Sequence, residues 1–274
     1  MYRRVARLSL IALSHLMRIR TFENSAAALE AFLAALSGRG GGSGWNHKQQ
    51  IRAILGEVNF RTGMVVLDVG GNNGKWSRSV YEQVSQYAPE FHIFECAPYC
   101  FEHLENNTRD IEKLSIVKKA VSTGSGYAML KAPILPEGVG SGLASLHQRE
   151  DSSITQHDYE EIRVETVSLD EYIKTNGIEH VDLLKVDVEG HELSVFEGAA
   201  SALQSKISIV SFEFGSGNVN SRTFFRDFWS LFNDFGFSMY RILPCGKVLE
   251  IRKYEDRLEY FRGASNIVCV KRTE

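Results

Sequence analysis

The sequence is poor in cysteine, and its few cysteines are scattered. Only four of the 274 residues are cysteines, at positions 96, 100, 245 and 269. This number is too small for the disulfide scaffold of a secreted domain, and the CxxxC pair has no second pair at the spacing of a zinc site. The pattern predicts reduced thiols, no structural metal and a cytoplasmic location.

The chain also lacks a strong excess of charge of one sign. Its formal net charge is -3, with 24% charged and 43% hydrophobic residues. This balance gives no general electrostatic attraction to nucleic acid, so we expect no nucleic-acid partner. The length and composition fit one large globular domain with an extension.

No hydrophobic run in the sequence is long enough to span a bilayer. The apolar stretch at residues 8–13 is short, and five arginines crowd the first twenty positions. No small-residue cleavage site follows as in a signal peptide. Two interpretations stay open: a helix that packs on the body or on a partner, or a helix that makes weak contact with a membrane surface through residues 1–20.

A glycine-rich stretch divides the sequence. Residues 1–36 have a helical composition, whereas residues 38–44 read GRGGGSG, which no helix accommodates cheaply. We therefore expect a helical extension and linker at residues 1–44 and a catalytic domain at residues 45–274.

Strands alternate with helices after residue 64, which predicts a doubly wound, mostly parallel, Rossmann-like α/β sheet. Seven strands are expected, at residues 64–69, 91–95, 115–121, 181–188, 207–214, 237–243 and 266–271. Two further alternating segments, 127–134 and 161–167, predict an inserted β extension. The polar loop at 138–158 within this insertion is expected to carry specificity for the acceptor.

A glycine loop follows the first expected strand. The sequence Asp68-Val69-Gly70-Gly71-Asn72-Asn73-Gly74 has Asn72 where a dinucleotide fingerprint requires glycine. The carboxylate of Asp68 would repel a pyrophosphate but suits an ammonium or sulfonium group. The loop therefore favours S-adenosylmethionine over a dinucleotide.

An acidic residue, Glu95, ends the second expected strand. A carboxylate in this place can accept hydrogen bonds from both hydroxyls of a ribose. The predicted cofactor-binding residues are Asp68, Gly70, Asn72, Gly74 and Glu95, and the predicted cofactor is S-adenosylmethionine.

A second group of ionisable residues follows the strand near residue 185. Lys185, Asp187, Glu189 and His191 alternate along the chain and would share a face wherever the backbone is extended. Such a cluster either fixes the turn into the next helix as a salt-bridge and capping network, or takes part in chemistry. Both interpretations stay open at this point.

Five segments resemble the FkbM-type methyltransferases. They are VVLDVGGNNG, FECAP, VETVSLDEYI, LLKVDVEGHELSVFEGA and ISIVSFEFG, and they cover roughly residues 60–215. The resemblance implies S-adenosylmethionine as methyl donor and, usually, O-methylation of sugars or natural-product hydroxyls. We therefore predict an O-methyltransferase acting on a small-molecule or glycan acceptor.

The catalytic prediction concerns the base that removes the proton of the acceptor hydroxyl. His191 is the first candidate because of its intrinsic pKa, and Asp187 and Glu189 are the others. Asp187, Glu189 and Glu213 could instead collect a divalent cation, although we predict no metal. Should this turn be only structural, the inserted loop offers Ser141, Ser145 and His147.

Two alternatives from other functional classes also share this fold. A nicotinamide-dependent oxidoreductase would need the second glycine of the fingerprint, which this loop lacks. A non-catalytic nucleotide-binding module would not need the full set of Asp68, Gly70, Gly74 and Glu95.

Overall fold

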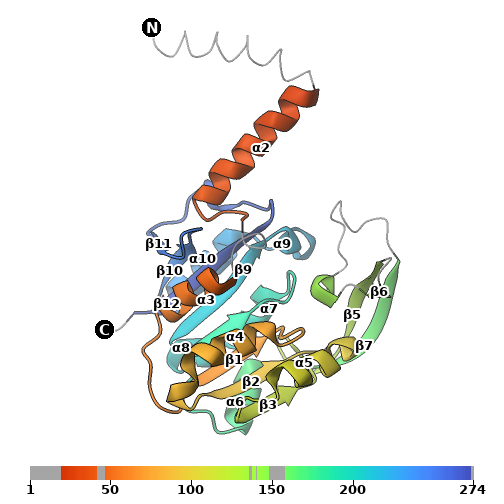
Figure 1. The fold of residues 1–274 in the computed structure, drawn as a ribbon, viewed down its shortest axis with the longest axis vertical. Helices are drawn as coiled ribbons and strands as arrows, with labels where there is room; N and C mark the ends of the chain where they lie inside the picture. The colour runs from red at the N-terminus through yellow and green to blue at the C-terminus, as the bar shows by residue number, and fades with distance from the viewer. Residues whose placement is uncertain (1–19, 42–46, 136–137, 140, 148–157, 273–274) are drawn as a thin grey trace.

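The structure is a computed structural model that describes residues 20–41, 47–135, 138–139, 141–147 and 158–272. Within them, an eight-stranded sheet runs in the order β11-β10-β12-β9-β8-β1-β2-β3 (Figure 1). Its strands are β1 (Val65–Val69), β2 (Glu90–Phe94), β3 (Lys113–Val117), β8 (Leu183–Val186), β9 (Ile209–Gly215), β10 (Phe237–Ile242), β11 (Val248–Ile251) and β12 (Ala264–Lys271).

The predicted fold class is confirmed, since β9, β8, β1, β2 and β3 pair in parallel. The sheet has one strand more than the seven expected. The chain after β10 turns back through Gly246, whose φ of 76° is left-handed, and adds β11 as an antiparallel edge strand. β11 is only four residues long, too short for its hydrophobic pattern to be recognised in the sequence.

Helices cover both faces of the sheet. One face carries α3 (His47–Leu55), α4 (Lys75–Val84) and α5 (Phe101–Thr108), and the other carries α6 (Leu169–Thr175), α7 (Glu192–Glu197), α8 (Ala200–Ser205) and α10 (Phe225–Asp234). Each face buries its own apolar cluster, because successive strand residues such as Val66 and Leu67 point to opposite sides. The aromatic residues predicted as core are buried on α10, as Phe225, Phe228 and Phe232 show.

Short elements complete the described chain. They are α9 (Ser216–Ser221) and the 3-10 turns η3 (Ser85–Tyr87), η4 (Pro98–Cys100), η5 (Ser141–Leu143) and η6 (Asp256–Leu258).

The predicted insertion forms a sheet of its own. Strands β4 (Ala120–Val121), β5 (Gly126–Leu135), β6 (Gly138–Val139) and β7 (Tyr159–Val167) run in the order β4-β7-β5-β6. A small apolar cluster joins this sheet, through residues such as Leu130 and Val164, to Ala97 and Cys100 after β2. The insertion therefore packs beside the carboxyl end of β2. Residues 140 and 148–157 of the expected polar loop lie outside the described residues.

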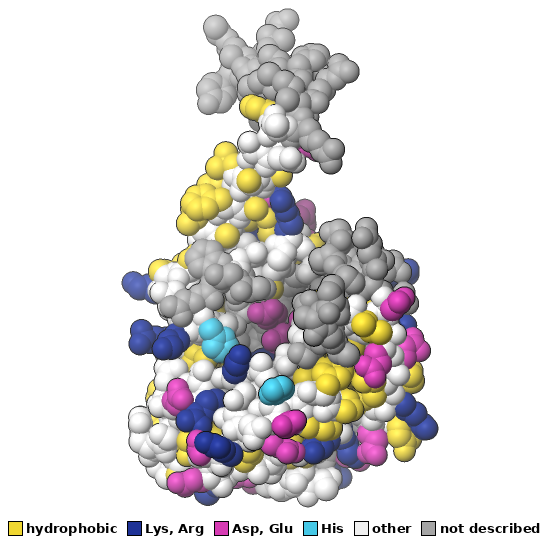
Figure 2. Space-filling model, turned by 45° about the vertical axis from the view of Figure 1, so that its right-hand side comes forward, with side chains coloured by type: hydrophobic (Ala, Val, Ile, Leu, Met, Phe, Trp, Pro, Cys, Tyr) yellow, Lys and Arg dark blue, Asp and Glu magenta, His cyan; other side chains and the backbone are white. Residues whose placement is uncertain are grey.

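The N-terminal extension contains α2 (Arg20–Leu36), which projects from the body (Figure 1). Apolar side chains are exposed along it (Figure 2), among them Phe22, Leu29 and Leu33. The described part of the glycine-rich segment contacts the body, since the N–H of Gly40 donates to Ser265 Oγ at 2.9 Å. Residues 1–19, on which the membrane-surface hypothesis rests, and 42–46 lie outside the described residues. In the part that is described, no helix is long and apolar enough to cross a membrane.

Candidate active site

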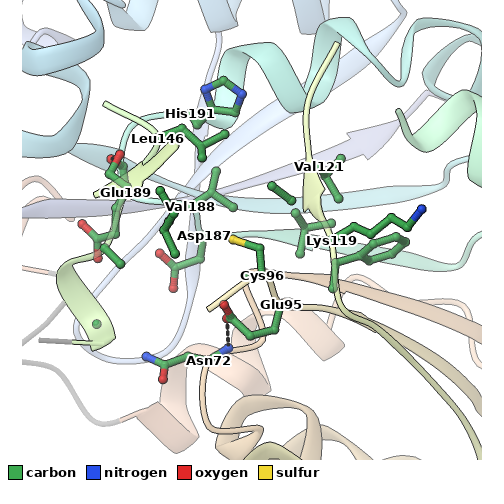
Figure 3. A pocket seen from close by; sticks show the side chains of 18 residues that line it. Asn72, Glu95, Cys96, Lys119, Val121, Leu146, Asp187, Val188, Glu189 and His191 are labelled. Atoms are coloured by element: carbon green, nitrogen blue, oxygen red, sulfur yellow. Dashed lines mark hydrogen bonds between the residues drawn. The ribbon is translucent and has the colours of Figure 1, made fainter. Parts of the chain in front are cut away.

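A cleft opens where β1, β2 and β8 end, the edge at which doubly wound sheets bind ligands. It encloses about 720 Å³, including its open mouth. Gly70 and Asn72 follow β1, Glu95 follows β2, and Asp187, Glu189 and His191 follow β8; all six line the cleft (Figure 3). The apolar part of its wall comes from Phe94, Val121 and, on the inserted segment, Leu130 and Leu146.

The loop after β1 is held tightly against its neighbours. The N–H groups of Gly70 and Gly71 donate to the carbonyl oxygen of Phe94 at 3.0 and 2.9 Å. Gly70 has a φ of 79°, and a Cβ at this position would lie 1.9 Å from the carbonyl oxygen of Asp187. Only glycine therefore allows the loops after β1 and β8 to approach this closely.

Glu95 is fixed by two backbone hydrogen bonds. Its Oε2 accepts from the N–H of Asn72 at 2.7 Å (Figure 3). Its Oε1 accepts from the N–H of Ala97 at 2.8 Å. Burial raises the pKa of Glu95, while these hydrogen bonds act in the opposite direction. Because each carboxylate oxygen has a second acceptor position, the group keeps the capacity to accept from a ligand in the cleft.

Asp68 does not line the cleft. Its carboxylate is fully buried, accepts from Ser77 Oγ at 2.6 Å and pairs with Lys185 Nζ at 3.0 Å. Lys185 also donates to the carbonyl oxygen of Gly70 at 2.7 Å. Burial alone would lower the pKa of Lys185, but the carboxylates of Asp68 and Asp187 outweigh it and raise the pKa to about 12. The sequence predicted that Asp68 contacts the cofactor directly. In the structure Asp68 instead pairs with Lys185, which fixes the glycine loop through the carbonyl oxygen of Gly70.

Gly74 also lies behind the cleft. Its φ is 76°, and a Cβ there would come within 2.8 Å of Thr108 and 2.9 Å of Leu104. This glycine allows α4 to pack closely on α5. Gly74 therefore supports the position of the loop after β1 but is not among the residues that line the cleft.

The turn after β8 brings the three predicted catalytic residues to the cleft but does not keep them on one face. The strand ends at Val186, and Glu189 and Gly190 have φ values of 53° and 103°, which end the alternation. The buried carboxylate of Glu192 closes the turn by accepting from the N–H groups of Val188 and Gly190, at 3.2 and 3.0 Å. Glu192, which follows this cluster in the chain, therefore has a structural role in the turn.

His191 is engaged at both ring nitrogens. Its Nε2 lies 2.9 Å from Ser122 Oγ, and its Nδ1 lies 3.1 Å from His147 Nε2. Burial, and then the neighbouring His147, lowers the pKa of His191 to about 4. A neutral imidazole held in this way ties the turn to the inserted segment and is a weak base. The sequence analysis offered His147 only as a secondary catalytic candidate. It contained no pattern that indicated a role for Ser122.

Ser145, another secondary catalytic candidate, also stabilises this turn. Its Oγ donates a hydrogen bond to the carbonyl oxygen of Glu189 at 2.8 Å. The 3-10 turn η5 contains Ser141, whose side chain lies outside the described set.

Glu213 lies near the carboxylates of the turn after β8. Burial, and then the carboxylates of Asp187 and Glu189, raises the pKa of Glu213 well above its usual range. Across the described ranges, no group of three or more His, Cys, Asp or Glu side chains is arranged to hold a metal ion.

The cleft fits the chemistry of S-adenosylmethionine. The apolar wall of Val121, Leu130 and Leu146 suits a purine ring, and the Glu95 carboxylate suits the two ribose hydroxyls. Asp187 adds a further carboxylate to the lining of the cleft.

Comparisons with known proteins identify the family of this chain. Residues 68–239 match the family described as "Methyltransferase FkbM domain". The chain is 30% identical, over 155 residues, to the hexuronic acid methyltransferase AglP of Haloferax volcanii; the aligned part is 56% of each protein. The chain thus spans little more than half of the length of this relative.

Two solved structures are similar at low identity. The methyltransferase FkbM from Methylobacillus flagellatus KT has a TM-score of 0.46 and 11% identity, and the match covers 78% of this chain and 45% of the other. A putative rRNA-methylase from Clostridium thermocellum has a TM-score of 0.46 and 10% identity, with 82% and 95% covered.

Proposed function

Because the chain belongs to the FkbM methyltransferase family, we propose that it transfers a methyl group from S-adenosylmethionine to an oxygen of a sugar-type acceptor. S-adenosylmethionine is the cofactor of this family, as the sequence predicted. The observation that carries the proposal is the convergence of Gly70, Glu95 and Asp187 on one cleft within the matched segment. The sugar-type acceptor is supported by the similarity to a hexuronic acid methyltransferase.

In this proposal, different residues of the cleft bind different parts of the cofactor. Glu95 accepts hydrogen bonds from the ribose, and the apolar wall that includes Val121 and Leu146 covers the purine and excludes water. The Asp68–Lys185 pair and Gly70 keep the loop in the shape that this requires. When bound, S-adenosylmethionine supplies an electrophilic methyl group on a positively charged sulfur.

Asp187 is the residue that we assign to the acceptor. Its side chain is 37% exposed and lies 3.7 Å from Lys185 Nζ, so it is accessible and is the charged partner of a buried ammonium group. Asp187 would accept the proton of the acceptor hydroxyl. The hydroxyl oxygen would take the methyl group as the bond from the methyl carbon to sulfur breaks, and S-adenosylhomocysteine would be the leaving group. His191 holds the turn, because both of its nitrogens are engaged and its pKa is low.

A labelled-methyl assay tests this function. The full chain is incubated with S-adenosylmethionine carrying a radioactive methyl group and with methyl glycosides of glucose, galactose, mannose and glucuronic acid. We expect base-stable label, as in an ether, in at least one sugar. Label in none of them, under conditions in which S-adenosylhomocysteine binds, would contradict the sugar-type acceptor.

A further inference from the structure

A second cavity adjoins the cleft. It encloses about 650 Å³, including its mouth, and lies between α3, α4 and the ends of β8, β9 and β12. We call it the α3 cavity. Asp187 lines both the cleft and the α3 cavity, and no other residue of the described ranges lines both. A molecule in the α3 cavity therefore lies next to whatever occupies the cleft, with the Asp187 carboxylate between them.

The lining of the α3 cavity is rich in groups that bind hydroxyls. Gln50 on α3 donates from Nε2 to Oδ1 of Asn266 on β12, and both side chains line the cavity. Each amide has more donor and acceptor positions than this one hydrogen bond uses. Trp76 on α4 supplies an apolar surface, and Glu213 and Asp187 supply carboxyl oxygens. A mixture of this kind matches a ring that carries several hydroxyl groups.

The charges of this lining disfavour an anion. Among the described residues of the lining, Lys185 is the only lysine or arginine. Its ammonium group is already engaged by Asp68, Asp187 and the carbonyl oxygen of Gly70. His47 also lines the cavity, and burial, followed by the charge of Lys185, lowers its pKa, so it adds no positive charge at neutral pH. An anionic ligand would meet Asp187 and Glu213 without an unengaged cation to balance it.

Resting on the proposed function, we propose that the α3 cavity holds an uncharged, hydroxyl-rich ring of the acceptor, and that Gln50 and Asn266 select it. Both residues lie outside the matched segment of residues 68–239, so membership of the family does not assign them a role. The two come from opposite ends of the chain and meet only because α3 packs beside β12. They are specificity residues of this chain.

Sugar binding to the full chain, saturated with S-adenosylhomocysteine, tests the proposal. The probes are the methyl glycosides of glucose, galactose and mannose, with methyl glucuronide as the charged counterpart, and the signal is tryptophan fluorescence. We expect a saturable change with at least one neutral glycoside, about tenfold weaker binding of the glucuronide, and loss of the signal in Trp76→Phe. Tighter binding of the glucuronide, or no response to any neutral glycoside, would overturn the proposal.

A pair of neighbouring glutamines supplies the matched control. Gln50→Ala should raise the Kd of the neutral glycoside by about tenfold, as expected for a lost hydrogen-bonding partner, and Gln49→Ala, which does not line the cavity, should leave it unchanged. Both variants should bind S-adenosylhomocysteine like the wild type, which also shows that they fold. A tenfold loss of S-adenosylhomocysteine affinity in Gln50→Ala would assign the cavity to the cofactor instead.

The outcome also separates this proposal from the function on which it rests. Methyl transfer to a sugar with the same KM in Gln50→Ala and wild type would support the proposed function and contradict the role of the α3 cavity. Sugar binding that depends on Gln50 without any methyl transfer would do the reverse.

Discussion

Replacement of Asp187 by Asn should lower kcat for methyl transfer by about a hundredfold or more at saturating cofactor. The substitution keeps the shape of the side chain but removes the group that takes the proton of the acceptor hydroxyl. The exposed Asp234→Asn variant on α10 is the control and should keep the wild-type kcat. Measurement of kcat at saturating S-adenosylmethionine separates the chemical step from any change in cofactor affinity.

The matching experiment at His191 distinguishes the two candidate bases. The pKa of His191 is lowered from 6.5 to about 4, so the ring is already neutral at pH 6 and does not titrate near neutrality. We expect His191→Ala to lower kcat far less than Asp187→Asn, and the pH profile of kcat to show no step near 6.5 that His191→Ala removes. A hundredfold loss in His191→Ala together with near-normal turnover in Asp187→Asn would reverse the assignment.

Replacement of Lys185 by Met should reduce the free energy of unfolding by about 3–5 kcal/mol, the usual cost of leaving a buried charge without its partner. Asp68 is fully buried and would lose its ion pair, and the carbonyl oxygen of Gly70 would lose its donor. Denaturant unfolding measures the change. Lys75→Met is the control, because Lys75 is exposed on the same side of the sheet and should change stability little.

The double variant Asp68→Asn with Lys185→Met should recover much of this loss, since no unpaired charge then remains buried. A single Lys185→Met variant as stable as the Lys75→Met control would show that the pair does not hold the glycine loop.

The parts of the site that follow a strand directly could be predicted from the sequence. Gly70, Asn72 and Glu95 each stand one to three residues beyond a strand, and parallel strands end at one edge, so local pattern and fold class together were enough to place them. The same reasoning placed Asp187 at the cleft.

The pairing of Asp68 with Lys185 could not be predicted in the same way. These residues are aligned partners on β1 and β8, which lie side by side although more than a hundred residues separate them. Without the order of the strands, Asp68 looks like a cofactor ligand, and only the register between β1 and β8 shows that an ammonium group already neutralises it.

The contacts that the insertion and α3 make could not be predicted from the sequence for a related reason. His147 meets His191, and Gln50 meets Asn266, only after separate elements pack together. No periodicity within either segment indicates such a partner, whereas it does indicate the buried aromatic face of α10.

The most direct test of the central claim is calorimetric titration of S-adenosylhomocysteine into the wild type and Glu95→Ala, with NAD as a second ligand. We expect one molecule of S-adenosylhomocysteine per chain, no heat with NAD, and binding weaker by about 1–3 kcal/mol in Glu95→Ala, because the ribose loses its acceptor. The exposed Glu102→Ala variant should bind like the wild type. Absence of binding to the wild type, or unchanged affinity in Glu95→Ala, would contradict the assignment of this cleft to the cofactor.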